Sequence, residues 1–305
     1  MSSFSEGSLE VCIAVPTLGK SPVLQKLLFD LEKQVRIHKS NLGMNFNLVV
    51  IDNEPSLKTK KIVEDLELFR YVKECNKGFA FARNRILDYA RGSDFVVMID
   101  DDMRLSDDWL KGVLHSINSN EAQIYSSDVF PDNVSRIPLS LRRFFIRPNR
   151  LVGRTTPNFG SGNVVLDMNF IESNSISFNL RFNKHGGEDV DFFNLMSSHG
   201  ALAKWVSNFP VYENYVDSQL TFRAVAKREF RTAKSFEKLL SDYSMRHRFY
   251  LFARIVEVAV LDWASLKIAF ASSENLYLKI KVYFYHKMIN LVKIFARLSA
   301  AFKRP

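Results

Sequence analysis

The sequence has few of the residues that mark disulfide-stapled, fibrous or disordered chains. Its 305 residues include two cysteines, 12 glycines and 9 prolines. Cys12 lies in an apolar, strand-like run, and Cys75 is not spaced from it as a CxxC pair. We therefore expect reduced, structural thiols rather than a disulfide or a thiolate metal site. Internal repeats and low-complexity tracts are also missing, so the chain fits one large globular domain or one domain with an appendage.

Long uncharged apolar runs are missing as well. No stretch of the sequence has the length and composition of a membrane-spanning helix. Residues 1–10 are polar and lack the basic-then-apolar pattern of a signal peptide, so we expect a cytoplasmic protein. Charge, by contrast, is unbalanced, with a formal net charge of +9. This excess favours an anionic partner: a nucleic acid, an anionic membrane surface or a phosphorylated substrate.

A run of five apolar residues, Phe95–Ile99, leads directly into Asp100, Asp101 and Asp102. The run is typical of a central strand in a parallel sheet, buried on both faces. Open α/β sheets bind ligands at the carboxyl ends of such strands. Because adjacent carboxylates repel one another, we expect a cation there, and Mg²⁺ or Mn²⁺ held by one or two carboxylates and substrate phosphates is the typical arrangement. The alternative is a solvated acidic turn that caps a helix beginning near Trp109.

The first hundred residues alternate between strand-like and helix-like segments. Strands are predicted at 11–15, 46–51 and 70–73, and helices after Ser21-Pro22, along Ile62, Val63, Leu66 and Phe69, and over 79–90. Ser21 is the expected N-cap of the first helix and Pro22 its first residue. This alternation predicts an α/β fold with a doubly wound, mostly parallel sheet flanked by helices.

The middle of the chain is less regular. Arginines at 142, 143, 147, 150 and 154, interrupted by prolines and a glycine, predict a mobile basic loop. The glycines of Gly160-Ser161-Gly162-Asn163 allow a ligand to approach the backbone, although such a pair usually marks a turn. Further on, Gly186-Gly187 precedes a helix whose first turn holds Glu188, Asp189 and Asp191. Acids in a first turn complement the helix dipole, so this pattern alone needs no catalytic role.

From Thr221 onward the sequence is basic and helical. Arg223, Lys227, Arg228 and Arg231 crowd one segment. Apolar residues then fall on one helical face, with basic residues on or near the opposite one: Leu276, Ile280, Phe284, Met288, Leu291, Val292 and Phe295 against Lys279, Lys287, Lys293 and Arg297. A basic amphipathic helix of this kind indicates binding to a membrane surface. Packing of the helix on its own domain explains the pattern equally well.

In their order along the chain, these motifs resemble the family-2 inverting glycosyltransferases, which have the GT-A fold. The resemblance runs from about Val11 to about Ser235. It is carried by Val15-Pro16-Thr17, Val50-Ile51-Asp52-Asn53, Asn76-Lys77-Gly78 with Ala82-Arg83-Asn84, Asp100-Asp101-Asp102, Gly160-Ser161-Gly162-Asn163 and Gly187-Glu188-Asp189. The chain departs from the family pattern at Asn53, where a second acid is usual, and at Glu213, where many relatives have a metal-binding histidine.

The resemblance implies roles for individual residues. Those that would line the nucleotide-sugar site are Pro16, Thr17, Asp52, Asn76, Gly78, Arg83, Asp100, Asp101 and Gly162. Asp52 would recognise a uracil ring and Arg83 would hold phosphates. Asp102, with Asp100, would bind Mn²⁺ or Mg²⁺. Asp189 would be the catalytic base, and Glu188 would support the acceptor or the geometry of its loop.

These roles predict a GT-A glycosyltransferase domain at residues 1–220 and a basic, membrane-associating helical region at 221–305. We expect a metal-dependent, inverting enzyme that moves a sugar from a nucleotide-diphosphate sugar, with a UDP-sugar favoured. The acceptor would be a hydroxyl of a glycan or a lipid-linked molecule, in cell-envelope polysaccharide synthesis. The protein would contact the anionic inner face of the cell membrane peripherally.

Two alternative functions stay open at this point. A nucleotidyltransferase would show a glycine-rich, basic loop directly after the first strand, where residues 15–20 supply one glycine and one lysine. A non-enzymatic module that binds nucleic acid or membrane would carry basic residues throughout. Here they concentrate in the middle loop and the C-terminal third, so we expect no nucleic-acid partner.

Overall fold

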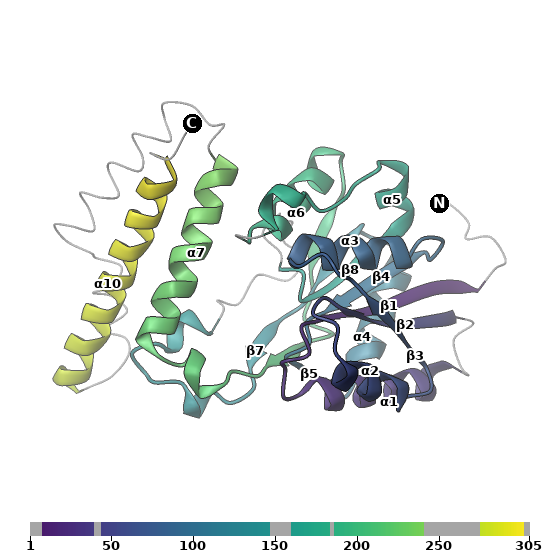
Figure 1. Ribbon diagram of the computed structural model, residues 1–305, viewed down its shortest axis with the longest axis horizontal. Coiled ribbons are helices and arrows are strands. Elements are labelled where there is room, and N and C mark those ends of the chain that lie inside the picture. Colours follow the sequence, from purple (N-terminus) through teal and green to yellow (C-terminus); the bar gives the residue numbers. More distant parts are fainter. Residues whose placement is uncertain (1–7, 40–43, 147–159, 184–185, 241–274, 302–305) are drawn as a thin grey trace. The chain divides into compact units, whose positions relative to one another are not determined.

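The computed structural model describes residues 8–39, 44–146, 160–183, 186–240 and 275–301, which form two compact units (Figure 1). The first unit comprises residues 1–132, 148–184 and 188–214, and the second comprises 133–147, 185–187 and 215–305. The predicted domain boundary after residue 220 stays a prediction.

The first unit is built on a seven-stranded sheet in the order β3-β2-β1-β4-β8-β6-β9. Its strands are β1 (Leu9–Thr17), β2 (Met44–Asp52), β3 (Phe69–Lys73), β4 (Phe95–Ile99), β6 (Ile124–Ser126), β8 (Asn163–Asp167) and β9 (Ala203–Trp205). The neighbours β3, β2, β1 and β4 are parallel, as are β6 and β9, and β8 is antiparallel to both β4 and β6. The predicted α/β fold with a mostly parallel sheet is confirmed.

Helices cover both faces of this sheet because the inner strands are apolar on both sides. The helices of the first unit are α1 (Leu24–Lys39), α2 (Leu57–Glu64), α3 (Phe79–Tyr89), α4 (Trp109–Ser119), α5 (Met168–Ser173) and α6 (Glu188–Ser198), with a short 3₁₀ turn, η3 (Leu180–Phe182). Along β1, Val11, Ile13 and Val15 pack into one core with α1 and α4. Cys12 and Ala14 point to the opposite core, with α3, α5 and α6. Burial raises the pKa of the Cys12 thiol to about 12, as befits a structural cysteine.

The first two predicted helices have different boundaries in the structure. The first helix begins at Leu24 rather than at Pro22, and the Ser21 hydroxyl accepts a hydrogen bond from the amide of Val23 (3.3 Å). Leu66 and Phe69, both predicted on the second helix, lie beyond the end of α2 at Glu64, and Phe69 begins β3. A short apolar spacing fits helix and strand alike, which explains the difference.

A small second sheet adjoins the carboxyl end of β4 in sequence. It consists of β5 (Met103–Leu105), β10 (Val211–Glu213) and β7 (Val129–Pro131), with β10 in the middle. β10 is antiparallel to β5, and its register sets Glu213 opposite Met103. The amide of Asn214 donates to the carbonyl of Asp102 (2.9 Å). This pairing brings a distant acid next to the acidic triplet.

The second unit contains two long helices, α7 (Phe222–Leu240) and α10 (Leu276–Ala301), and the 3₁₀ turns η1 (Val134–Arg136), η2 (Arg142–Phe144) and η4 (Asp217–Gln219). α10 packs against α7. The predicted basic loop begins in η2, and from residue 147 onward it lies outside the described residues. Among the helices that the structure describes, none has the length and apolar composition needed to cross a membrane.

Candidate active site

The predicted site residues gather where the chain changes direction across the sheet. From β1 the chain proceeds outward to β2 and β3, and then returns to form β4 on the other side of β1. Because β1, β2 and β4 are parallel, Thr17, Asp52 and Asp100 all stand at the same edge of the sheet. Such a switch point is where open α/β sheets bind ligands.

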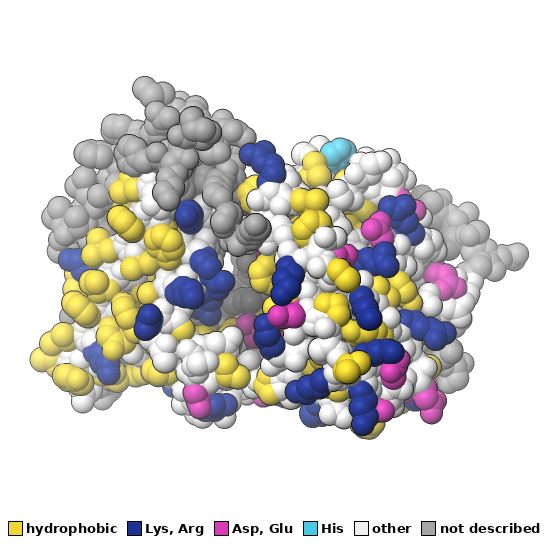
Figure 2. Space-filling model, viewed as in Figure 1, with side chains coloured by type: hydrophobic (Ala, Val, Ile, Leu, Met, Phe, Trp, Pro, Cys, Tyr) yellow, Lys and Arg dark blue, Asp and Glu magenta, His cyan; other side chains and the backbone are white. Residues whose placement is uncertain are grey.

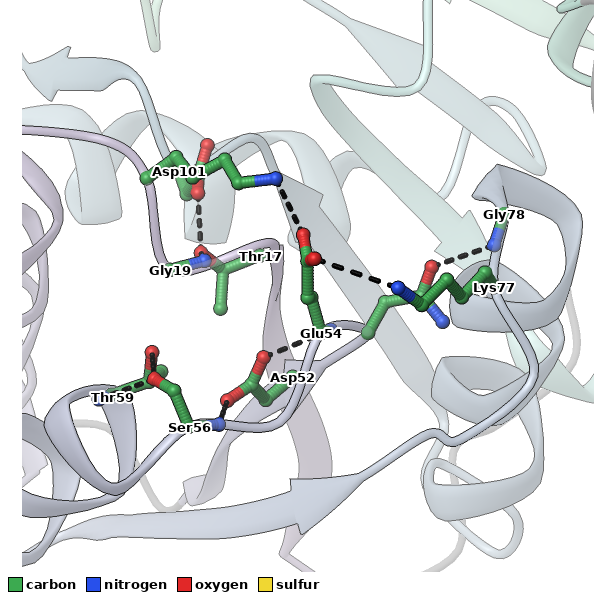
Figure 3. Close-up of polar contacts among 11 residues, drawn as sticks. Thr17, Gly19, Asp52, Glu54, Ser56, Thr59, Lys77, Gly78 and Asp101 are labelled. Carbon is green, nitrogen blue, oxygen red and sulfur yellow. Dashed lines mark hydrogen bonds and ion pairs between the residues drawn. The ribbon is translucent and has the colours of Figure 1, made fainter.

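Thr17 and Asp101 join β1 and β4 across this switch point (Figure 3). The hydroxyl of Thr17 donates a hydrogen bond to the Asp101 carboxylate and accepts one from the amide of Gly19 (2.8 Å). Burial raises the pKa of Asp101 to about 6, and the nearby Asp100 charge adds to this, while the Thr17 bond opposes it. Thr17 thus fixes the turn after β1 to the acidic triplet.

Asp102 lies in the most strongly negative part of the site. Its pKa is raised to about 8. Burial is the main cause, and the charges of Asp100, Glu213 and Asp101 act in the same direction. Glu213 is the residue that stands where many relatives have a histidine. Its position near Asp102 could not be predicted from the sequence, because the pairing of β5 with β10 brings the two together.

A divalent cation fits this donor set. Carboxylates crowded at a half-buried edge repel one another, and a cation would remove that repulsion. Within the described residues, no three His, Cys, Asp or Glu side chains form a complete metal site by themselves. Mg²⁺ is typically held by only one or two carboxylates, with substrate phosphates and water completing its shell. Asp102 and Asp100 match that requirement, and metal binding there stays a prediction.

Asp52 is fully buried and bonded to its own loop (Figure 3). One of its carboxylate oxygens accepts from the amide of Glu54 (3.1 Å). The other accepts from the amide of Ser56 (3.1 Å) and the hydroxyl of Tyr71 (2.8 Å). The structure thus gives Asp52 a role in shaping the loop after β2. Its predicted contact with a nucleobase stays a prediction.

Asn53 braces the neighbouring loop, a role that the sequence did not reveal. Its side-chain oxygen accepts from the amide of Gly78 (2.8 Å), and its side-chain nitrogen donates to the carbonyls of Asn76 (2.7 Å) and Glu74 (3.3 Å). A carboxylate cannot donate to two carbonyls. This explains why an amide stands where the resemblance leads one to expect an acid. The same bonds hold the predicted ligand-lining residues Asn76 and Gly78 in place.

Gly78 directly precedes α3 and has a backbone conformation that favours glycine. Its φ is +133°, and an added Cβ would collide with the side-chain amide of Asn183. That amide caps α3, because its oxygen accepts from the amides of Ala80 (3.2 Å) and Phe81 (3.4 Å). The sequence did not single out Asn183, since it lies about a hundred residues from the helix that it caps.

Lys20 and Lys77 meet at Glu54 beside this edge (Figure 3). The Lys20 ammonium lies 2.5 Å from one Glu54 oxygen and the Lys77 ammonium 3.5 Å from the other. These hydrogen bonds and charges lower the pKa of the Glu54 carboxyl, with Lys20 the main cause. Neither lysine was predicted as a site residue, and all three side chains are solvent-accessible.

Arg83 is buried and paired with Glu188 rather than lying open to a ligand. Its guanidinium contacts the Glu188 carboxylate, and its Nη2 lies 3.9 Å from Oδ1 of Asp100. Glu188 is 4% exposed. Burial raises the pKa of its carboxyl, Arg83 lowers it and Asp189 raises it. The predicted role of Arg83 in holding phosphates stays a prediction.

Asp189 differs from Glu188 in exposure. It is half-buried, and one of its oxygens accepts from the amide of Val190 (2.8 Å). Among the two acids that open α6, Asp189 is therefore the one that an external hydroxyl can reach. Gly162 and Pro16 complete the predicted set at the ends of β8 and β1, and the carbonyl of Gly162 accepts from the amide of Asp100 (3.1 Å).

Comparison with known proteins identifies the family of this chain. The sequence pattern of "Glycosyl transferase family 2" matches residues 12–173, more than half of the chain. The succinoglycan biosynthesis protein ExoM of Rhizobium meliloti (strain 1021) is 26% identical over 208 residues, which make up 64% of this chain and 65% of ExoM. The chain thus matches somewhat less than two thirds of that relative's length.

Solved structures share the fold. A mannosyltransferase from Pyrobaculum calidifontis, in complex with GDP-Man and Mn²⁺, has a TM-score of 0.64 and 18% identity, over 98% of this chain and 89% of that one. S. aureus TarS 1-349 in complex with UDP has a TM-score of 0.54 and 16% identity, over 93% and 90%. These likenesses agree with the predicted GT-A fold. The family match decides the assignment: the chain belongs to glycosyl transferase family 2.

Proposed function

We propose that this glycosyltransferase moves a sugar from a nucleotide-diphosphate sugar, with a UDP-sugar favoured, to a hydroxyl of a glycan or lipid-linked acceptor, with inversion. The observation that carries this proposal is the arrangement at one edge of the sheet. A cluster of acids suited to a cation lies at the switch point, and the half-buried Asp189 stands at the start of α6. The UDP and GDP-Man complexes of the structural neighbours, and the succinoglycan biosynthesis of ExoM, support a nucleotide-sugar donor and a polysaccharide product.

In an inverting transfer, the acceptor oxygen attacks the anomeric carbon as the bond from that carbon to the diphosphate breaks. The acceptor hydroxyl loses its proton in this step, and a positioned carboxylate can take it. Asp189 is suited to that role because it is accessible, whereas Glu188 is buried against Arg83. Asp102 and Asp100 would hold a divalent cation, which stabilises the negative charge of a leaving diphosphate as a Lewis acid.

Replacement of Asp189 tests the proposed base. Asp189→Asn should reduce turnover by about 10²–10⁴-fold, the usual cost of losing a general base. Nucleotide binding should persist, because Asp189 is assigned to the acceptor side. Asp191→Asn is the matched control, since Asp191 lies in the same helical turn, and it should retain most turnover.

NMR of the product formed by the wild-type enzyme gives the stereochemistry. An anomeric configuration opposite to that of the donor supports the proposal, and a retained configuration contradicts it. Near-normal turnover of Asp189→Asn would also contradict the assignment of the base.

We also propose that the second unit contacts an anionic membrane surface through one face of α7 and α10. α10 packs against α7, and its buried residues are Val282, His286, Ile289 and Ala296. The predicted apolar face is left exposed: Leu276, Ile280, Phe284 and Phe295 are 57–70% exposed and Leu291 36%. Packing of α10 on its own unit and binding of α10 to a membrane are thus compatible, because they would use different faces of the helix.

A basic row lies along α7. Arg223, Lys227 and Arg231 are exposed and spaced by four residues, so they share one helical face. Figure 2 shows hydrophobic side chains gathered over α10 and basic side chains over α7 on the same face of this unit. An apolar band beside a basic band is complementary to the acyl chains and headgroups of an anionic bilayer. Basic residues near such a surface contribute about 1 kcal/mol each.

Flotation with anionic and zwitterionic vesicles tests this contact. The full chain should float with phosphatidylglycerol vesicles, and Ile280→Ser with Phe284→Ser, or the triple Arg223→Gln, Lys227→Gln, Arg231→Gln, should abolish flotation. A control triple removes three exposed lysines of the first unit: Lys26→Gln, Lys33→Gln and Lys58→Gln. Equal flotation of all variants would contradict the proposed surface. The proposed surface would also be contradicted if the full chain bound no vesicles and instead formed a dimer that the apolar substitutions dissociate.

A further inference from the structure

Arg83 is a buried cation held among groups from separate elements. It contacts Glu188 of α6, and its Nη2 lies 3.9 Å from the Asp100 carboxylate that follows β4. The ring centroids of Phe79 and Phe178 lie 5.8 and 5.9 Å from its Cζ. A buried guanidinium needs such compensation, because an unpaired buried charge is strongly destabilising.

Further contacts tie α3 to the chain just before α6. The side chain of Asn84 accepts from the amide of Phe178 (2.7 Å) and donates to its carbonyl (2.8 Å). The side chain of Asn183 caps α3 and also donates to the carbonyl of Lys77 (2.7 Å). Phe178 in turn stacks on Phe192 of α6, with centroids 4.0 Å apart. α3 is therefore the platform on which the start of α6 rests.

Glu188 depends on Arg83 for its compensation. Its Oε1 is the atom that Arg83 contacts, and its Oε2 is buried without a hydrogen-bond partner in the described structure. Without Glu188, the anionic neighbour left to Arg83 would be Asp100. A cation at Asp102 and Asp100 would then compete with a guanidinium for the same carboxylate.

We propose that Glu188 is a positioning residue that acts through Arg83. The buried pair keeps the guanidinium from binding Asp100 tightly, and it fixes the start of α6, with Asp189, to the helix that borders the acidic triplet. This inference rests on the proposed function, since Asp100 and Asp189 have their roles there. It differs from a direct role of Glu188 with the acceptor, which would use the unpartnered Oε2.

A double-mutant cycle tests the inference. By calorimetry, Glu188→Gln should weaken Mn²⁺-assisted UDP binding by about 10–100-fold, the usual cost of removing a group that orients a metal ligand. Its kcat should fall as well, with the KM for the acceptor unchanged. Arg83→Met with Glu188→Gln should be no worse than Arg83→Met alone, because the two residues act as one unit. Arg85→Met, an exposed arginine on the same helix, is the matched control and should bind UDP normally.

Two results would overturn the inference. One is a raised acceptor KM for Glu188→Gln with unchanged UDP affinity, which indicates direct contact with the acceptor. The other is a double mutant whose loss equals the product of the two single losses. Should Glu188→Gln not fold, Arg83→Met with Glu188→Leu replaces the buried pair by apolar groups and restores a folded reference. Absence of UDP binding in the wild type would contradict the proposed function itself, whereas either of these two results, in a wild type that binds UDP, contradicts only this inference.

Discussion

At this site, the hydrogen bonds that Asn53 and Asp52 make explain the residue type at each position as well as charge does. Asn53 must donate to two carbonyls and accept from one amide, and an amide side chain does both. Asp52 only accepts, from two amides and a hydroxyl, which suits a carboxylate. The different hydrogen-bonding partners of positions 52 and 53 therefore explain why one holds an acid and the other an amide.

Asn53→Asp should destabilise the protein, although it restores the acid that is usual in the family. The new carboxylate would lose both donated bonds and face two carbonyl oxygens in a buried position. Leaving buried polar groups unsatisfied costs about 1–3 kcal/mol, which chemical denaturation would measure. Asn118→Asp adds the same charge at an exposed position and should change the unfolding free energy little. An unchanged stability of Asn53→Asp would show that the loop does not depend on these bonds.

At the scale of elements, the close approach of β4 and β8 shapes the acidic edge. Gly162 precedes β8, and a Cβ on it would lie 2.8 Å from Cγ of Asp100 and closer still to one of its oxygens. The absence of a side chain at Gly162 therefore sets where the Asp100 carboxylate can stand. This is a packing reason for a glycine in a motif that the sequence alone marks only as a turn.

Gly162→Ala should displace Asp100 and cost about 1–3 kcal/mol of stability, as overpacking usually does. In an Asp100→Ala background the obstructing carboxylate is gone, so the same substitution should cost much less. Thermal unfolding of the four proteins in this cycle measures the difference. If Gly162→Ala cost the same stability in the wild type and in Asp100→Ala, contact with the Asp100 carboxylate would not be the cause of that cost.

How much the sequence predicted also differs between elements. Phe95–Ile99 was predicted correctly because an unbroken apolar run has few alternatives, and β4 is buried at every position. The contacts of Asn53 and Asn183 could not be predicted, because they join segments 25 and 103 residues apart. In α10 the sequence indicated one apolar face, whereas the structure buries another that mixes valine, histidine, isoleucine and alanine. Mixed faces of that kind carry no clear hydrophobic periodicity.

At the scale of the whole molecule, the proposed sugar transfer concerns the first unit and the proposed membrane contact concerns the second. The family match covers residues 12–173, which include the acidic triplet, whereas Glu188 and Asp189 of α6 and the helices α7 and α10 lie beyond it. The α/β fold could be predicted because strand-like and helix-like segments alternate along the first hundred residues.

The central claim is that the acidic edge at the β1–β4 switch point binds a nucleoside diphosphate together with a divalent cation. Calorimetric titration of UDP, with and without Mn²⁺, into wild type, Asp102→Asn and the exposed control Asp107→Asn tests this most directly. A ligand that binds only the folded state also raises stability, by about 2.7 kcal/mol at one hundred times its Kd. We predict Mn²⁺-dependent binding in the wild type and in Asp107→Asn, and its loss in a folded Asp102→Asn. Binding of UDP by Asp102→Asn with unchanged affinity and unchanged dependence on Mn²⁺ would contradict the account.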